Sequence, residues 1–187
     1  RLRGTGGDDM KSETAVLAGG CFWCIEAALQ RVRGVLSAMP GYVGGDVAEP
    51  SYEEVCTGRT GHAEAVEIVF DADEISYADL LRLFFAVHDP TTVDRQGADV
   101  GSQYRSAIFY RDSAQRETAE SVIAELEREH AFPAPIVTEV APLERFWPAE
   151  AYHRDYFLRH PQQAYCQIVI APKLEKLRKL YAERLQA

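Results

Sequence analysis

The sequence predicts an α+β fold: a loop-rich single domain in which helices pack on a mixed or antiparallel sheet, as a two-layer sandwich of the ferredoxin-like plait type. Two observations predict this class. Strand and helix patterns mix along the chain without the strict strand–helix–strand order of a parallel sheet. The 187 residues, 47% of them apolar, supply enough material for one hydrophobic core and about one domain.

The first strand and helix are predicted from a change of period near Cys21. Residues 14–18 form a short apolar run that Gly19 and Gly20 break, and apolar residues then recur at helical spacing from Phe22 onward. Cys21 is therefore expected at the first residue or the cap of a helix. Unpaired amides and the helix dipole favour an anion at that place.

The later elements are predicted from the same two periods, from capping residues and from prolines. Strict alternation gives the clearest strand, residues 63–70. Ser76 and Asp112 are typical caps at the start of a helix, and Pro133 ends the second of these helices. The other expected elements are extended segments at 35–43, 104–110, 136–140 and 166–171, a helical turn at Tyr52, a loop over 89–101, and helices at 77–88, 113–130, 149–159 and 174–185.

Charge and hydropathy argue against several classes of protein. The chain has 20 Lys and Arg against 29 Asp and Glu, a net charge of −9, which argues against nucleic-acid binding. No run of about 18 apolar residues occurs, so no membrane association is expected. Residues 1–9 are polar and glycine-rich and are interpreted as a cloning remnant or a disordered arm before a native start at Met10. No secretory leader opens the chain, and a cytoplasmic location is expected.

Four cysteines are too sparse for a fold built on disulfides: Cys21, Cys24, Cys56 and Cys166. A thiol at a helix N-terminus has a stabilised thiolate, which is the nucleophilic form, and Phe22 and Trp23 beside it can form an apolar pocket wall. Other interpretations of the Cys-x-x-Cys stay open at this point. They are buried core cysteines, a zinc-stabilised binding module, and a thioredoxin-like thiol–disulfide exchanger.

Glu64 is the second candidate for chemistry. Side chains alternate between the two faces of a strand, so the carboxyl of Glu64 is expected on the face shared with Val66, Ile68 and Phe70. Desolvation on such an apolar face raises the pKa of a carboxyl group. Glu64 would then donate a proton near neutral pH, unless the strand end lies in solvent. No phosphate-binding glycine motif and no metal-binding histidine spacing occurs, so neither a cofactor nor a metal is predicted.

Several short segments resemble, in sequence and in order, the A-type peptide methionine sulfoxide reductases. The resemblance extends from about Thr14 to about Lys173 and is far more specific than any single motif. The matching segments are Gly20-Cys21-Phe22-Trp23, Tyr52 to Cys56, Gly61 to Val66, His88-Asp89-Pro90, Gln96 to Asp99, Gly101 to Ser106, and Tyr165-Cys166.

The resemblance implies a single catalytic domain, residues 10–187, that reduces the S epimer of methionine sulfoxide, free or in proteins. It also implies a sulfenic acid on the nucleophile, an intramolecular disulfide, and thioredoxin as the reductant. By this resemblance Cys21 is the nucleophile and Glu64 is the proton donor. Tyr52, Asp99 and Tyr104 would orient the sulfoxide oxygen. Phe22 and Trp23 would form the pocket for the S-methyl group.

Two cysteines are candidates to resolve the sulfenic acid. Cys166 matches the resolving position near the C-terminus of the family, whereas Cys24 stands where many relatives have glycine. A bridge from Cys21 to Cys24 inside a regular helix strains disulfide geometry unless the turn is loose. Cys166 is therefore preferred, although it heads a predicted strand. Cys56 is expected to be a buried structural thiol.

Overall fold

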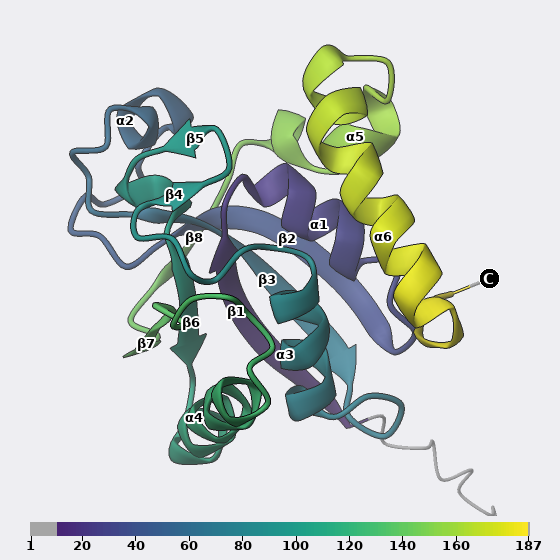
Figure 1. Cartoon of the computed structure of the whole chain (residues 1–187). Coiled ribbons are helices and arrows are strands. Elements are labelled where there is room, and N and C mark those ends of the chain that lie inside the picture. Colours follow the sequence, from purple (N-terminus) through teal and green to yellow (C-terminus); the bar gives the residue numbers. More distant parts are fainter. Residues whose placement is uncertain (1–10, 187) are drawn as a thin grey trace, which may run out of the picture.

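A six-stranded sheet is the frame of the molecule in the computed structural model, which describes residues 11–186 (Figure 1). The predictions for residues 1–9 and Met10 lie outside the described residues. The strands are β1 (Ser12–Gly19), β2 (Val35–Val43), β3 (Ala63–Asp71), β6 (Ser106–Tyr110), β7 (Glu139–Pro142) and β8 (Phe146–Pro148), with a separate pair, β4 (Arg95–Gln96) and β5 (Asp99–Val100). The helices are α1 (Phe22–Leu29), α2 (Tyr52–Cys56), α3 (Tyr77–Ala86), α4 (Ser113–Arg128), α5 (Tyr156–Arg159) and α6 (Ala171–Tyr181).

The strand order confirms the predicted plait. The sheet runs β7-β6-β1-β3-β2-β8, and its four inner strands pair antiparallel. With α1 between β1 and β2, and α3 between β3 and β6, these elements have the order and pairing of a split βαβ repeat. β7 joins one edge in parallel and β8 joins the other antiparallel, so the sheet is mixed.

The helices form the second layer on one face of the sheet. α1 contacts β1, β2 and β3, α3 contacts β1, and α5 and α6 pack against α1 from outside (Figure 1). The main core lies between these layers, where burial of apolar area is the chief stabilising term. Its fully buried members include Leu17, Phe22, Ile25, Val66, Ile68, Phe70, Leu80 and Phe84.

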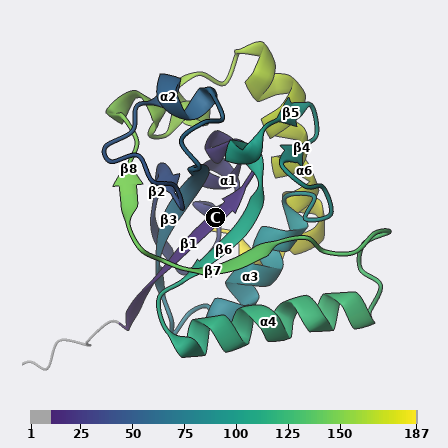
Figure 2. The ribbon, with the colours of Figure 1, turned by 90° about the vertical axis from the view of Figure 1, so that its left-hand side faces the viewer.

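The other face of the sheet carries a second, smaller apolar cluster that includes Phe109 and several alanines. Ala18, Ala63, Ala65 and Ala107 are buried there. The chain from β7 to β8 runs between the two edge strands and crosses this face (Figure 2). Among residues 11–186, no helix is long and apolar enough to cross a membrane.

The predicted strand over 166–171 is wrong. Cys166–Ile170 is a π-helical turn that continues into α6, and Cys166, Ile170 and Leu174 are buried at helical spacing. A short apolar run does not distinguish a strand from a buried helix face, which explains the error.

Three further predictions need correction. The helix expected over 149–159 is a 3-10 turn, Ala151–His153, followed by the short α5, because Asp155 adopts left-handed backbone angles between them. Tyr104 ends a 3-10 turn, and the strand starts at Ser106. Cys56, which the sequence predicts to be buried, is exposed at the end of the five-residue α2, whose buried residue is Val55.

Candidate active site

Cys21 lies where the sequence predicts it, at the cap of α1 directly after β1. Gly20 before it has φ +93°, and a Cβ at this position would lie 2.5 Å from Cγ of Gln96. Only glycine combines this backbone with this close approach. The turn therefore brings the segment that carries Gln96 and Asp99 next to the nucleophile candidate.

Glu64 lies on the central strand β3, and its side chain is 1% exposed. Its Oε1 accepts a hydrogen bond from the backbone N–H of Phe22 at 3.1 Å, whereas its buried Oε2 has no partner among the described residues. Burial raises the pKa of Glu64 to about 8, against the opposing effect of the Phe22 hydrogen bond. A neutral carboxyl with one uncommitted oxygen thus lies at the N-terminus of α1.

The two thiols of the Cys-x-x-Cys interact directly. Burial raises the pKa of Cys21 well above its usual value, as do its hydrogen bond to Cys24 and the charge of Glu64. The hydrogen bond from Cys21 lowers the pKa of Cys24 to about 7, with help from the charge of Lys173. Burial of Cys21 therefore opposes the stabilisation of its thiolate that is predicted at the end of a helix. The two thiols titrate as a pair.

Asp99 reaches this pair through Tyr165. The Tyr165 hydroxyl donates to Oδ2 of Asp99 at 2.8 Å and lies 3.7 Å from Sγ of Cys24. The charge of Asp99 also raises the pKa of Glu64, so the two carboxyls belong to one site. Tyr165 matches the family motif, but the sequence predicts no role for it.

Tyr52 and Tyr104 also lie in this site. Burial and the charge of Glu64 raise the pKa of both phenols, and Cys21 contributes in the same direction. Both side chains are therefore neutral hydroxyls and can donate a hydrogen bond to a substrate oxygen. The ring of Tyr52 also stacks on Phe22, with centroids 6.2 Å apart and 19° between planes.

The aromatic wall beside Cys21 includes two residues that the sequence did not indicate. The indole N–H of Trp23 donates a hydrogen bond to Nδ1 of His153 at 3.0 Å. The ring of Tyr156 stacks on Trp23, with ring centroids 3.7 Å apart and 5° between the ring planes. His153 is fully buried and also packs against Phe22 at 4.9 Å. Their spacing in an irregular segment carries no periodic signal by which they could be found.

Glu150 supports the wall from the side of α2. Its Oε1 accepts from the Tyr42 hydroxyl at 2.8 Å, and its Oε2 accepts from the backbone N–H of Tyr52 at 3.0 Å. Glu150 thereby fixes the first residue of α2 relative to β2. The segment 150–156 thus contacts Tyr52, Phe22 and Trp23.

The remaining cysteines differ in access. Cys166 is 0% exposed, and burial and the charge of Cys24 raise the pKa of its thiol. Cys56 is exposed on α2, and its thiol interacts with the hydroxyl of Tyr52. Among residues 11–186, no group of three or more His, Cys, Asp or Glu side chains is placed to hold a metal ion.

A buried sulfur nucleophile beside a protonated carboxyl and a second thiol is the chemistry of thiol-dependent oxidoreductases, in which sulfur attacks an oxidised substrate. Comparison with known proteins identifies the family. The family model described as "Peptide methionine sulfoxide reductase" matches residues 13–185. The chain belongs to this family, and it is an enzyme that reduces methionine sulfoxide.

Individual relatives agree with this assignment. Peptide methionine sulfoxide reductase MsrA of Thermus thermophilus is 59% identical over 177 residues, 95% of this chain and 99% of the relative. The reduced form of Mxr1 from Saccharomyces cerevisiae has a TM-score of 0.78 at 31% identity and covers 85% of this chain and 91% of Mxr1. Mxr1 in complex with Trx2 has the same fold, with a TM-score of 0.56 at 22% identity, over 80% of this chain and 87% of Mxr1.

Proposed function

We propose that this chain reduces the S epimer of methionine sulfoxide through a sulfenic acid on Cys21, with Glu64 as the proton donor. The carboxyl of Glu64 carries the proposal. One of its oxygens accepts a hydrogen bond from Phe22, and the other is buried without a partner among the described residues. The carboxyl thus lies at the N-terminus of α1, the helix whose cap is Cys21. A protonated Oε2 in this place can donate to the sulfoxide oxygen, and oxygen transfer requires that proton.

The first chemical step balances with the groups present. Cys24, whose pKa is about 7, is the thiolate that takes the proton of Cys21, and the Cys21 thiolate then attacks the sulfoxide sulfur and forms an S–S bond to it. The proton of Glu64 goes to the sulfoxide oxygen, and the hydroxyl moves from the substrate sulfur to Cys21: the S–O bond to the substrate and the S–S bond of the adduct break, and an S–O bond to Cys21 forms. The products are methionine, a sulfenic acid on Cys21, the thiol of Cys24 and the carboxylate of Glu64.

The preference for one epimer follows from two fixed contacts. Phe22 and Trp23 supply an apolar wall for the S-methyl group, whereas Glu64, Tyr52 and Tyr104 surround the place of the oxygen. With methyl and oxygen both held, a chiral sulfur has one orientation for the rest of the substrate. This supports selection of a single epimer; the choice of S is taken from the family resemblance.

The sequence favours Cys166 as the thiol that resolves the sulfenic acid. Two observations in the structure support Cys24 in that role. Cys24 already interacts with Cys21, and Cys21 is a cap residue with φ −58° and ψ 127°, outside the regular helix in which a bridge would be strained. The step forms the Cys21–Cys24 bond and releases water. Cys166, whose buried thiol is influenced by the charge of Cys24, is the second candidate.

Thioredoxin is proposed as the reductant of this disulfide. The enzyme is proposed to be cytoplasmic, with residues 10–187 as its catalytic domain. The complex of the relative Mxr1 with Trx2 supports the partner. Exchange with an external dithiol restores both thiols. A reducing compartment also suits four free cysteines.

The test is a turnover assay with the separate S and R epimers, each with thioredoxin and, independently, with dithiothreitol. The proposal predicts methionine from the S epimer under both conditions. Turnover of the R epimer alone would contradict the epimer assignment. Reduction of insulin disulfides without sulfoxide turnover would instead support a thiol–disulfide exchanger.

A further inference from the structure

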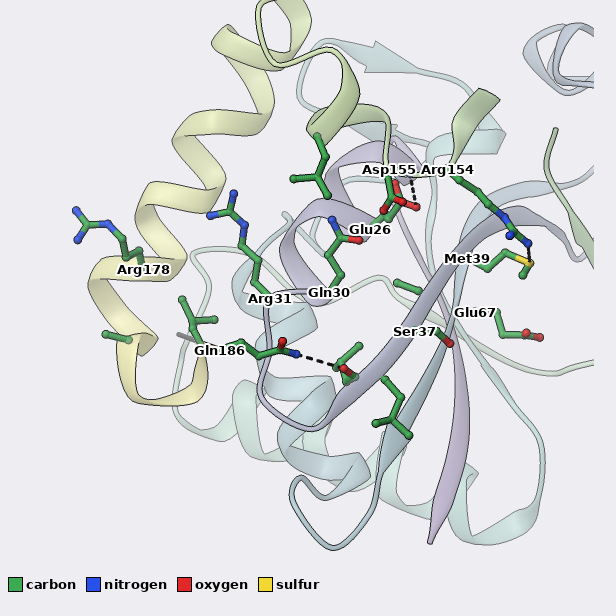
Figure 3. Close-up of a pocket in the computed structure, with 16 residues that line it drawn as sticks. Glu26, Gln30, Arg31, Ser37, Met39, Glu67, Arg154, Asp155, Arg178 and Gln186 are labelled. Carbon is green, nitrogen blue, oxygen red and sulfur yellow. Dashed lines mark hydrogen bonds between the residues drawn. The ribbon is translucent and has the colours of Figure 1, made fainter. Parts of the chain in front are cut away.

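Glu26 is a buried acid with no part in the chemistry described above. It lies on α1, three residues after Trp23, and is 1% exposed. Its Oε2 accepts a hydrogen bond from the backbone N–H of Asp155 at 3.1 Å (Figure 3). Residues three apart on a helix share one face, so Trp23 and Glu26 face the same segment of chain.

The segment that Glu26 holds is a strained turn. Asp155 has φ 52° and ψ 34°, left-handed angles that are unfavourable for a residue with a side chain, and its side chain makes no cap to α5. Such a conformation persists only where its surroundings impose it. The hydrogen bond to Glu26 acts directly on the strained residue.

The same turn carries the two side chains that hold Trp23. Tyr156, directly after Asp155, stacks on the indole, and His153, two residues before it, accepts the indole N–H. A shift of the turn moves both contacts together. The orientation of Trp23 is therefore mechanically linked to the carboxyl of Glu26.

Within the segment itself, the guanidinium of Arg159 also donates hydrogen bonds to the backbone carbonyls of Tyr152 and Arg154. The other side of the turn faces a cavity of about 890 Å³, lined by Glu26, Arg154 and Asp155 among others, and this cavity includes neither Cys21 nor Glu64 (Figure 3). Within the part of the chain that the structure describes, no cation lies within ion-pair distance of Glu26. Burial of this carboxyl is unfavourable unless hydrogen bonds compensate it, and the N–H of Asp155, in the turn, is a compensating donor.

We infer that Glu26 is a positioning residue for substrate binding: by holding the Asp155–Tyr156 turn it fixes the wall of the methyl-binding pocket at Trp23. The inference rests on the proposed function, because it assigns this wall to methionine sulfoxide. Loss of the Glu26 contact weakens binding of the substrate. Cys21 and Glu64 are held by other contacts, so the chemical step itself is retained.

The test compares Glu26→Gln and Glu26→Ala with the control Glu67→Gln. Glu67 lines the same cavity from β3, and among the described residues its side chain makes no hydrogen bond to the turn. Steady-state kinetics with the S epimer and saturating dithiothreitol separate KM from kcat. In a Trp147→Phe background, acrylamide quenching of Trp23 fluorescence reports the wall without any turnover. Thermal unfolding shows whether each variant is folded.

The inference predicts that KM rises about five- to twenty-fold in the Ala variant and less in the isosteric Gln variant, with kcat changed less than about three-fold. Quenching of Trp23 increases in the same order, and the Glu67 control matches the parent in both. A folded Ala variant with parental KM and parental quenching would overturn the inference, as would a loss confined to kcat. If the parent does not reduce methionine sulfoxide, the proposed function fails, whereas the quenching data still show whether Glu26 positions Trp23.

Discussion

The carboxyl of Glu64 accepts the backbone N–H of Phe22 at 3.1 Å, which joins the centre of the sheet to the first residue of α1. The acid on β3 and the sulfur at the cap of α1 are therefore held by one contact. The second oxygen of the carboxyl is buried and has no partner among the described residues. This geometry supports the proposed roles, proton donor for Glu64 and nucleophile for Cys21.

Replacement of Glu64 by Gln is expected to lower the rate of the sulfoxide-reducing step about 10²- to 10⁴-fold, the usual contribution of a positioned general acid. The amide keeps the shape and the acceptor for Phe22 but carries no transferable proton. Single-turnover formation of methionine measures this rate. Glu67→Gln, on the face of β3 opposite Glu64, is the control. An equal loss in that variant would contradict a specific role for Glu64.

The activity is expected to fall as the pH rises through about 8. Burial raises the pKa of Glu64 to about 8, so the carboxyl is protonated below that value and ionised above it. The single-turnover rate across pH 6 to 10 checks this, and the alkaline limb should disappear in the Gln variant. A rate that keeps rising above pH 9 would show that the proton comes from another group.

Glu64→Gln is also expected to stabilise the fold above neutral pH. The pKa of Glu64 is higher in the folded chain than in the unfolded chain, so its contribution to stability is fully present below about pH 4.5 and is lost as the pH rises through about 8. The Gln side chain avoids this loss. The variant should gain on the order of 2–4 kcal/mol in free energy of unfolding at pH 9 relative to the parent, and much less at pH 4. Urea unfolding at both pH values tests it; an equal difference at both would contradict the linkage.

Disulfide mapping after one turnover is expected to find the Cys21–Cys24 bond. The thiols of these two residues already interact, whereas Cys166 is fully buried and has no hydrogen bond to Cys21 among the described residues. Replacement of Cys24 by Ser should leave a sulfenic acid on Cys21 for longer than replacement of Cys166 does. A Cys21–Cys166 bond as the first product would reverse the assignment.

Replacement of Glu150 by Ala is expected to reduce both stability and activity. The change leaves the Tyr42 hydroxyl and the Tyr52 amide without their acceptor, at a cost of about 1–3 kcal/mol, and releases Tyr52 from its place over Phe22. Urea unfolding and kcat/KM measure the two effects. Glu53→Ala on the exposed side of α2 should alter neither by a comparable amount.

The parts of the site that could be predicted are those on regular elements. Period two correctly placed Glu64 on the apolar face of β3, and the glycine pair followed by helical spacing correctly placed Cys21 at the cap of α1. The length of β2 was also predicted as Val35–Val43. In each case the local pattern and the tertiary contacts favour the same conformation.

The rest depends on contacts between distant residues. The turn at Asp155 is left-handed without glycine, so its backbone angles carry no local signal, and the hydrogen bond to Glu26 that supports it spans most of the chain. The raised pKa of Cys21 is likewise a property of burial and cannot be inferred from helix position alone. His153 and Tyr156 enter the site only because this turn places them there.

A single turnover of the Cys24→Ser variant with the S epimer, in the absence of reductant, tests the central claim most directly. One equivalent of methionine per chain is expected, formed more slowly than in the parent because Cys24 no longer takes the Cys21 proton, together with a sulfenic acid on Cys21 that a dimedone-type probe labels and mass spectrometry locates. Methionine formed without label on Cys21, or a label on another cysteine only, would contradict Cys21 as the atom that takes the oxygen.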